Sequence, residues 1–192
     1  MKRSKGLNIA LTVVSVLFIG FSGTLLVKYI NNKIKSKKNK NILLLGGLDN
    51  RKGDISIGEQ VELLKIGASE SKSIEGFRYN DIIGLLNTIN NSEKEMYVVL
   101  FSAGCSKSRE VAETLKQKGY NLNYMFIVEP YAKSSTIISS VIDAVNIGVP
   151  SKNVMVGRSE STGMGVIKNP TFTPNCTPNH LCSLTEVGKI IK

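Results

Sequence analysis

Histidine and cysteine are scarce in this chain of 192 residues. There is one histidine, His180, and there are three cysteines, Cys105, Cys176 and Cys182, with no C-x-x-C spacing among them. A structural zinc site usually needs about four such ligands at close spacing. The sequence therefore predicts no metal site, and His180 is the single imidazole available for acid–base chemistry near neutral pH.

Motifs that cradle nucleotide phosphates are also absent. Neither G-x-x-x-x-G-K-[ST] nor G-x-G-x-x-G occurs in the sequence. A flavodoxin-like phosphate or nucleotide binder would have to use residues 46–50 or 102–108 as its phosphate loop, and neither segment has such a motif. The sequence therefore favours this function least. We therefore expect no bound cofactor.

Acidic residues are missing from residues 1–40, which hold nine of the 25 lysines and arginines. The net charge of +10 at pH 7 arises almost entirely there, because residues 41–192 carry 16 basic and 15 acidic side chains. The basic run at 33–40 contains no aromatic residue. This run favours attraction to anionic lipid headgroups, and no nucleic-acid partner is expected.

Residues 7–27 form an uncharged, apolar run of 21 residues. A helix of that length crosses a hydrocarbon core of roughly 30 Å. A cleaved signal peptide is the alternative, with Ser22 and Gly23 at the cleavage site, but the apolar run continues beyond them. We predict a basic N-terminus at 1–6, a single-pass transmembrane anchor at 7–30, a basic juxtamembrane linker at 31–40 and one folded domain at 41–192.

The orientation of this anchor follows from the charges on its two sides. Three basic residues precede the apolar run and six follow it, between residues 28 and 40. By the positive-inside tendency, the folded domain is expected in the cytoplasm, where cysteines stay reduced. In the opposite orientation Cys176 and Cys182 could close a small disulfide loop, which would count against this expectation.

Short apolar runs alternate with helical segments along residues 41–192. The predicted strands are 41–45, 73–79, 96–101, 122–128 and 153–156, and the predicted helices are 57–66, 81–89, 106–118, 134–147 and 183–191. The strands lack polar alternation, which is typical of a mostly parallel sheet covered by helices on both faces. The predicted fold class is therefore α/β, doubly wound, with ligands at the carboxyl ends of the strands.

The residues that follow these strands resemble the motifs of the α/β-hydrolase family. G-G-L-D follows the first strand, S-A-G-C-S-K-S follows the third, glutamates follow the fourth and fifth, and the histidine precedes the last helix. The resemblance covers residues 41–192. It implies a minimal, lidless serine hydrolase in which a serine, an acid and a histidine cleave an ester or amide.

Ser102 and Ser106 are the candidate nucleophiles. Ser102 ends the apolar run, and F-S-A-G-C resembles the F-S-A-G-G turn of many esterases, although Leu100 stands where G-x-S-x-G has a glycine. Ser106 has Gly104 and Ser108 at the flanking positions but lies several residues beyond the strand. We therefore prefer Ser102. Helix N-capping is the alternative role for either serine.

The resemblance also implies the remaining site residues. The backbone N–H groups of Leu48 and Ala103 would bind the oxyanion. Glu129 and Glu160 are alternatives for the acid that orients His180, the general base, and both stand where aspartate is commoner. Glu129 is preferred because its neighbours Val128 and Pro130 fix its backbone. A solvated glutamate at the end of a strand is the alternative for each.

Two functions follow from these expectations. The first is a membrane-anchored serine hydrolase whose substrate is a small ester, an amide or, because of the tethering, a lipid-like molecule. The second is a catalytically inactive α/β module that serves as a membrane- or virion-associated binding or structural protein.

Overall fold

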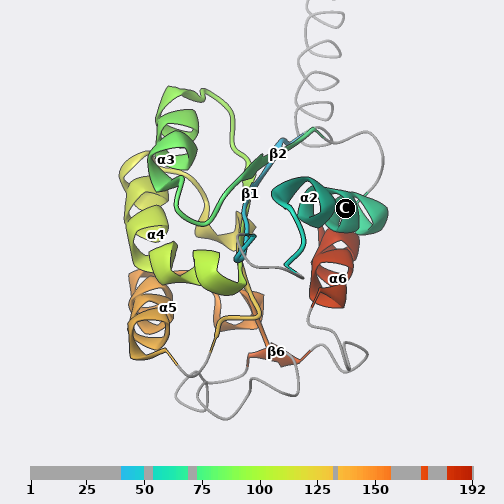
Figure 1. Ribbon diagram of the computed structural model, residues 1–192. Helices are drawn as coiled ribbons and strands as arrows, with labels where there is room; N and C mark the ends of the chain where they lie inside the picture. Colours follow the sequence, from blue (N-terminus) through green and yellow to red (C-terminus); the bar gives the residue numbers. More distant parts are fainter. Residues whose placement is uncertain are drawn as a thin grey trace, which may run out of the picture. The chain divides into compact units, whose positions relative to one another are not determined.

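Six parallel strands form one sheet in the computed structural model, which describes residues 40–49, 54–68, 73–131, 134–156, 170–172 and 181–191 (Figure 1). The strands are β1 Ile42–Leu45, β2 Ile74–Phe77, β3 Tyr97–Phe101, β4 Met125–Val128, β5 Val154–Val156 and β6 Thr171–Phe172. Their order is β2-β1-β3-β4-β5-β6, and each neighbouring pair is parallel. The predicted α/β class is confirmed.

Helices cover both faces of this sheet (Figure 1). They are α2 Ile57–Gly67, α3 Ile82–Asn91, α4 Ser108–Gln117, α5 Ser135–Ile147 and α6 Cys182–Ile190. Leu43 and Leu45 of β1 pack in one core with α3, α4 and α5, whereas Ile42 and Leu44 pack in another with α2 and α6. Alternate residues of each central strand thus meet helices on opposite faces, which explains why the strands are apolar throughout.

Helix ends follow from local sequence. Ser56 accepts a hydrogen bond from the Glu59 N–H, and the Glu59 side chain in turn accepts one from the Ser56 N–H, so α2 begins with a capping box. Gly148, at a φ of +135°, ends α5. Gly119, at +73°, follows α4. Glycine adopts these φ values without steric cost.

The two helices on the α2 side cross at close range. A Cβ atom on Gly67 would collide with the Thr185 carbonyl oxygen, and one on Gly188 would collide with the Leu64 carbonyl oxygen. Backbone therefore approaches backbone at this crossing, which only glycine permits. The crossing fixes the middle and end of α6 against the last turn of α2.

The strands and helices predicted from periodicity are present, with ends that shift by a few residues. The structure adds β6, a two-residue strand within a segment expected to be a polar loop, because two residues carry no detectable period. Among the described residues it also adds three short 3₁₀ segments at predicted element starts: Ser102–Lys107 before α4, Leu122–Tyr124 before β4 and Ser151–Asn153 before β5.

Lys40 marks the beginning of the folded unit, Lys40–Lys192. Its side chain is buried, pairs with Glu95 at 3.0 Å and lies 3.1 Å from the centre of the Tyr124 ring. It is therefore part of the domain and not of the linker predicted at 31–40. The predicted anchor at 7–30 lies outside the described residues. Within the residues that are described, no helix has the length and apolarity needed to cross a membrane.

Candidate active site

The carboxyl ends of β1, β3 and β4 bring the predicted site residues to one edge of the sheet. These three strands are neighbours in the order β1-β3-β4. Phe101 of β3 pairs with Val128 of β4, so Ser102 and Glu129 are the next residues beyond the paired ends. Neighbouring strands lie about 4.8 Å apart. The preferred serine and the preferred acid therefore leave the sheet side by side.

Ser102 and Glu129 also share a strained backbone. Among the described non-glycine residues, only these two have positive φ, at +51° and +49°. A left-handed conformation costs an ordinary residue about 1–2 kcal/mol. Such strain is found preferentially at functional sites, where the surrounding structure imposes it. At Ser102 it turns the chain from β3 into the 3₁₀ segment that leads to α4.

Two glycines allow this turn to contact the loop after β1. A Cβ atom on Gly47 would lie 3.0 Å from the Ser102 Cβ, and one on Gly104 would lie 2.5 Å from the Leu45 carbonyl oxygen. The small residue two positions after Ser102 is thus required by the approach of β1. Leu100, two positions before it, is fully buried in the core instead.

A buried glutamine organises the loop after β1. The Gly47 N–H donates to the Gln60 Oε1 at 2.8 Å, while the Gln60 Nε2 donates to the Ile55 carbonyl at 3.1 Å. The Gly47 amide is therefore already engaged. The next amide along the loop belongs to Leu48, and it makes no hydrogen bond to any other described residue. Leu48 and Ala103 are both half-buried, as oxyanion donors at an accessible site would be.

Glu129 is held inside the protein. Its residue exposure is 2%, and its Oε1 accepts a hydrogen bond of 2.7 Å from the Ser183 hydroxyl. Its N–H donates to the Met155 carbonyl at 2.8 Å. Ser183 lies in the first turn of α6, where the helix dipole stabilises a negative charge. The alternative of a solvated glutamate is therefore wrong for Glu129.

Cys105 is excluded as a nucleophile. Its thiol is fully buried and donates to the carbonyls of Leu100 and Val128, at 3.3 and 3.5 Å. Burial raises the pKa of this thiol far above its usual range, so it stays protonated. Its role is packing beneath the serine turn.

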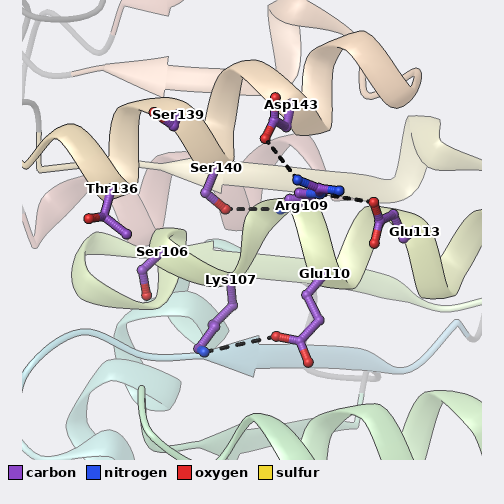
Figure 2. Close-up of a pocket in the computed structure, with 9 residues that line it drawn as sticks. All are labelled: Ser106, Lys107, Arg109, Glu110, Glu113, Thr136, Ser139, Ser140 and Asp143. Atoms are coloured by element: carbon purple, nitrogen blue, oxygen red, sulfur yellow. Dashed lines mark hydrogen bonds and ion pairs between the residues drawn. The ribbon is translucent and has the colours of Figure 1, made fainter.

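Ser106 lies in different surroundings from Ser102. It lines a polar groove of about 440 Å³ between α4 and α5 (Figure 2). The residues around it are Lys107, Arg109, Glu110, Glu113, Thr136, Ser139, Ser140 and Asp143. The charges in this groove pair with one another: Arg109 bridges Glu113 at 2.9 Å and Asp143 at 3.6 Å. Ser102, in contrast, contacts the loop after β1.

The remaining predicted site residues, Glu160 and His180, lie outside the described residues. Cys182, two residues after His180, is disulfide-bonded, whereas Cys105 is free. Cys176 is the only other cysteine in the sequence. In the described part of the chain, no cluster of three or more His, Cys, Asp or Glu side chains could hold a metal ion.

Gln60 and Ser183 were not foreseen as members of the site. Both are polar residues on the buried side of an otherwise apolar helix face, next to Leu64 and Leu184 in the core. A polar side chain at such a position must find a hydrogen-bond partner. That pattern is the signal that would have identified them.

No protein-family model, no curated protein and no solved structure matches this chain. The structure itself places the chain in the class of α/β proteins. Its distinguishing features are a strained turn at Ser102 and the buried Glu129, both at the carboxyl edge of a parallel sheet.

Proposed function

We propose that the chain is a membrane-anchored serine hydrolase of the α/β-hydrolase type that cleaves an ester or an amide. The observation that carries this proposal is the paired strain of Ser102 and Glu129 at the carboxyl ends of adjacent strands. A helix N-cap has an extended backbone, so the left-handed Ser102 does not have the conformation of an N-cap, whereas a nucleophile elbow is a sharp, strained turn.

The reaction follows the serine–histidine–acid scheme. The Ser102 hydroxyl oxygen attacks the substrate carbonyl carbon and passes its proton to His180, while the N–H groups of Leu48 and Ala103 bind the negative carbonyl oxygen. The C–O or C–N bond then breaks, and His180 returns the proton to the leaving group. Water attacks the acyl–Ser102 ester in the same way, which releases the acid and restores the serine.

Glu129 would hold the imidazole in place and stabilise its charged form. His180 is three positions before Ser183 in the chain, and the Ser183 hydroxyl donates to Glu129. A three-residue connection spans at most about 11 Å, so the chain length allows His180 to reach this carboxylate. Glu160 remains the alternative acid.

Activity-based labelling tests this function. The full chain, reconstituted in phosphatidylcholine vesicles, is treated with a fluorophosphonate probe, which reacts only with an activated serine. We expect labelling to be lost in Ser102→Ala and His180→Ala and retained in Ser106→Ala. Glu129→Gln should slow labelling by about 10²-fold or more, because the imidazole loses its anionic partner. Glu160→Gln tests the alternative acid and should label normally.

The second candidate function is a catalytically inactive module. The observation that favours it is the Ser183 hydrogen bond, which gives Glu129 a structural partner within α6. A folded wild-type chain that takes up no probe would replace the hydrolase proposal with this one. Labelling that survives in Ser102→Ala but not in Ser106→Ala would move the nucleophile to Ser106.

A further inference from the structure

Arg78 follows β2 at the edge of the sheet where the candidate active site lies. β2 and β3 pair with the two sides of β1, so these two strands lie about 10 Å apart, twice the usual strand spacing. Leu45 of β1 is in register with both Phe77 and Leu100. Arg78 and Ser102 therefore leave the sheet within one residue of the same level, with about 10 Å between their strands.

The side chain of Arg78 is directed toward the loop after β1, the strand that lies between it and the serine turn. Its Nε lies 3.1 Å from the Oδ2 of Asp49. Asp49 directly follows Leu48, the proposed oxyanion donor, and Leu48 follows Gly47, which contacts Ser102. The guanidinium group is therefore held beside the loop that contacts the serine turn.

Both members of this ion pair have a fixed position. The Gly46 N–H donates to the Phe77 carbonyl at 2.9 Å, and the Asp81 N–H donates to the Arg78 carbonyl at 2.9 Å, so hydrogen bonds hold the chain on both sides of Arg78. The Asp49 side chain is 2% exposed, whereas that of Arg78 is 63% exposed. A buried carboxylate thus positions an arginine that solvent, or a ligand, can reach.

Stability does not explain this ion pair. A buried carboxylate is unfavourable unless hydrogen bonds satisfy both of its oxygens. The Asp49 Oδ1 is buried and has no hydrogen-bond partner in the part of the chain that the structure describes. A pair with an exposed arginine stabilises little, because water screens it. Such an arrangement is typical of functional sites, so the role that remains for Asp49 is to orient Arg78.

The contact with Asp49 leaves most of the guanidinium group open. Arginine has five N–H donors in a planar fork, and this contact is made by the one on Nε. The two Nη groups of Arg78 have no partner other than Asp49 among the described residues. Lys107 and Arg109, which follow β3, are instead bridged to glutamates of α4. Two Nη groups side by side suit a bidentate bond to a planar carboxylate.

We propose that Arg78, oriented by Asp49, binds a carboxylate of the substrate, so that the substrate class is an ester or amide that also carries a free carboxylate. This inference rests on the proposed hydrolase function. A carboxylate matches the site better than a doubly charged phosphate, because Asp49 already offsets part of the single positive charge of Arg78. The distance between the strands places this carboxylate several atoms from the bond that is cleaved.

The experiment measures hydrolysis of two matched pairs of esters by the full chain in phosphatidylcholine vesicles. p-Nitrophenyl hydrogen adipate and its methyl ester carry the carboxylate, free or blocked, on the acyl part. 4-Carboxyphenyl butyrate and its methyl ester carry it on the leaving group. In one of these pairs, Arg78→Gln should lower the ratio of kcat/KM for the free acid to that for the methyl ester about tenfold, through loss of a charge-assisted bond.

Two further variants separate recognition from general damage. Arg109→Gln is the matched control, because Arg109 is 60% exposed and pairs with Glu113 but lines the groove between α4 and α5 (Figure 2). It should leave both ratios unchanged. Asp49→Asn should raise KM for the preferred free acid by about twofold to fivefold and leave kcat/KM for its methyl ester unchanged, which loss of folded protein alone would not do.

The other outcomes overturn the inference in distinguishable ways. Ser102-dependent hydrolysis whose ratios are the same in wild type and Arg78→Gln, or an equal loss on free acids and methyl esters, would remove the carboxylate site and leave the hydrolase. Faster, Arg78-dependent cleavage of p-nitrophenyl 5-phosphonopentanoate than of the adipate would assign the site to phosphate instead. The absence of both probe labelling and ester hydrolysis would remove the hydrolase and, with it, this role of Arg78.

Discussion

Ser102 is a residue whose local backbone cost and proposed chemical role can be separated by experiment. Its φ of +51° is imposed by its surroundings: Gly47 on one side and the close approach of Gly104 to β1 on the other. A serine gains nothing energetically from this conformation. The strain is therefore expected to be kept for function rather than for stability.

Replacing Ser102 with glycine tests that separation. Glycine adopts positive φ without the Cβ clash, so Ser102→Gly should raise the free energy of unfolding by about 0.5–1 kcal/mol, the relieved strain less the added chain entropy. Probe labelling should disappear in the same variant. Urea unfolding of the full chain in detergent, followed by far-UV circular dichroism, measures the stability.

Ser106→Gly is the control for this substitution. Ser106 lies in the same 3₁₀ segment but is not among the residues with positive φ. Glycine should therefore lower stability there by about 0.5–1 kcal/mol through chain entropy alone. Equal destabilisation by both substitutions would show that Ser102 carries no strain.

At the residue scale, the sequence indicated where the serine and the acid lie but not how they are held. The apolar run ending at Phe101 predicted a turn at Ser102, and the pair Val128 and Pro130 suggested a fixed backbone at Glu129. Burial of Glu129 and its bond to Ser183 could not be predicted, because the partners are 54 positions apart in the chain. Contacts of that range depend on how α6 packs on the sheet.

The secondary-structure elements, unlike these contacts, could mostly be predicted from the sequence. Helical periodicity identified α5 over nearly its full length, because its apolar residues recur at three- and four-residue spacing along the face that packs on the core. The all-apolar strands identified a parallel sheet with two covered faces. Two-residue β6 was missed, since a strand this short has neither period nor composition to reveal it.

The crossing of α2 and α6 is the element-scale feature most sensitive to one added methyl group. Gly188→Ala would place a Cβ against the Leu64 carbonyl oxygen, an atom of the backbone that cannot rotate away. We expect this substitution to lower the free energy of unfolding by about 1–3 kcal/mol, as overpacking does in other cores. The same urea titration measures it.

Gly58→Ala supplies the matched comparison. Gly58 lies in the first turn of α2, is exposed, and an added Cβ would have the Ser56 hydroxyl oxygen as its nearest neighbour, at 3.8 Å. Alanine should therefore raise stability there by up to about 0.5–1 kcal/mol, through helix propensity. If Gly188→Ala lowered the free energy of unfolding no more than Gly58→Ala does, that result would contradict the close approach of α2 and α6.

At the scale of the whole molecule, two observations favour opposite sides of a membrane for a domain on the proposed anchor. The basic excess after the apolar run favours a cytoplasmic domain by the positive-inside tendency. The disulfide at Cys182 favours an oxidising compartment, because cytosolic thiols are kept reduced. The difference in charge is modest, three residues against six, whereas a structural disulfide depends directly on the compartment. The disulfide is therefore the better guide.

Counting thiols on the full chain decides between the two sides. Cells that make the protein are treated with a membrane-permeant maleimide before lysis, so that air oxidation cannot create a bond. With Cys105 buried and Cys182 bonded, the native protein should take up no label, the denatured protein one label, and the denatured and reduced protein three.

Cys182→Ser should raise the denatured count to two, by releasing Cys176. Three labels on denatured, unreduced protein would instead place the domain in a reducing compartment, and the cytoplasmic orientation expected from the basic residues would then hold.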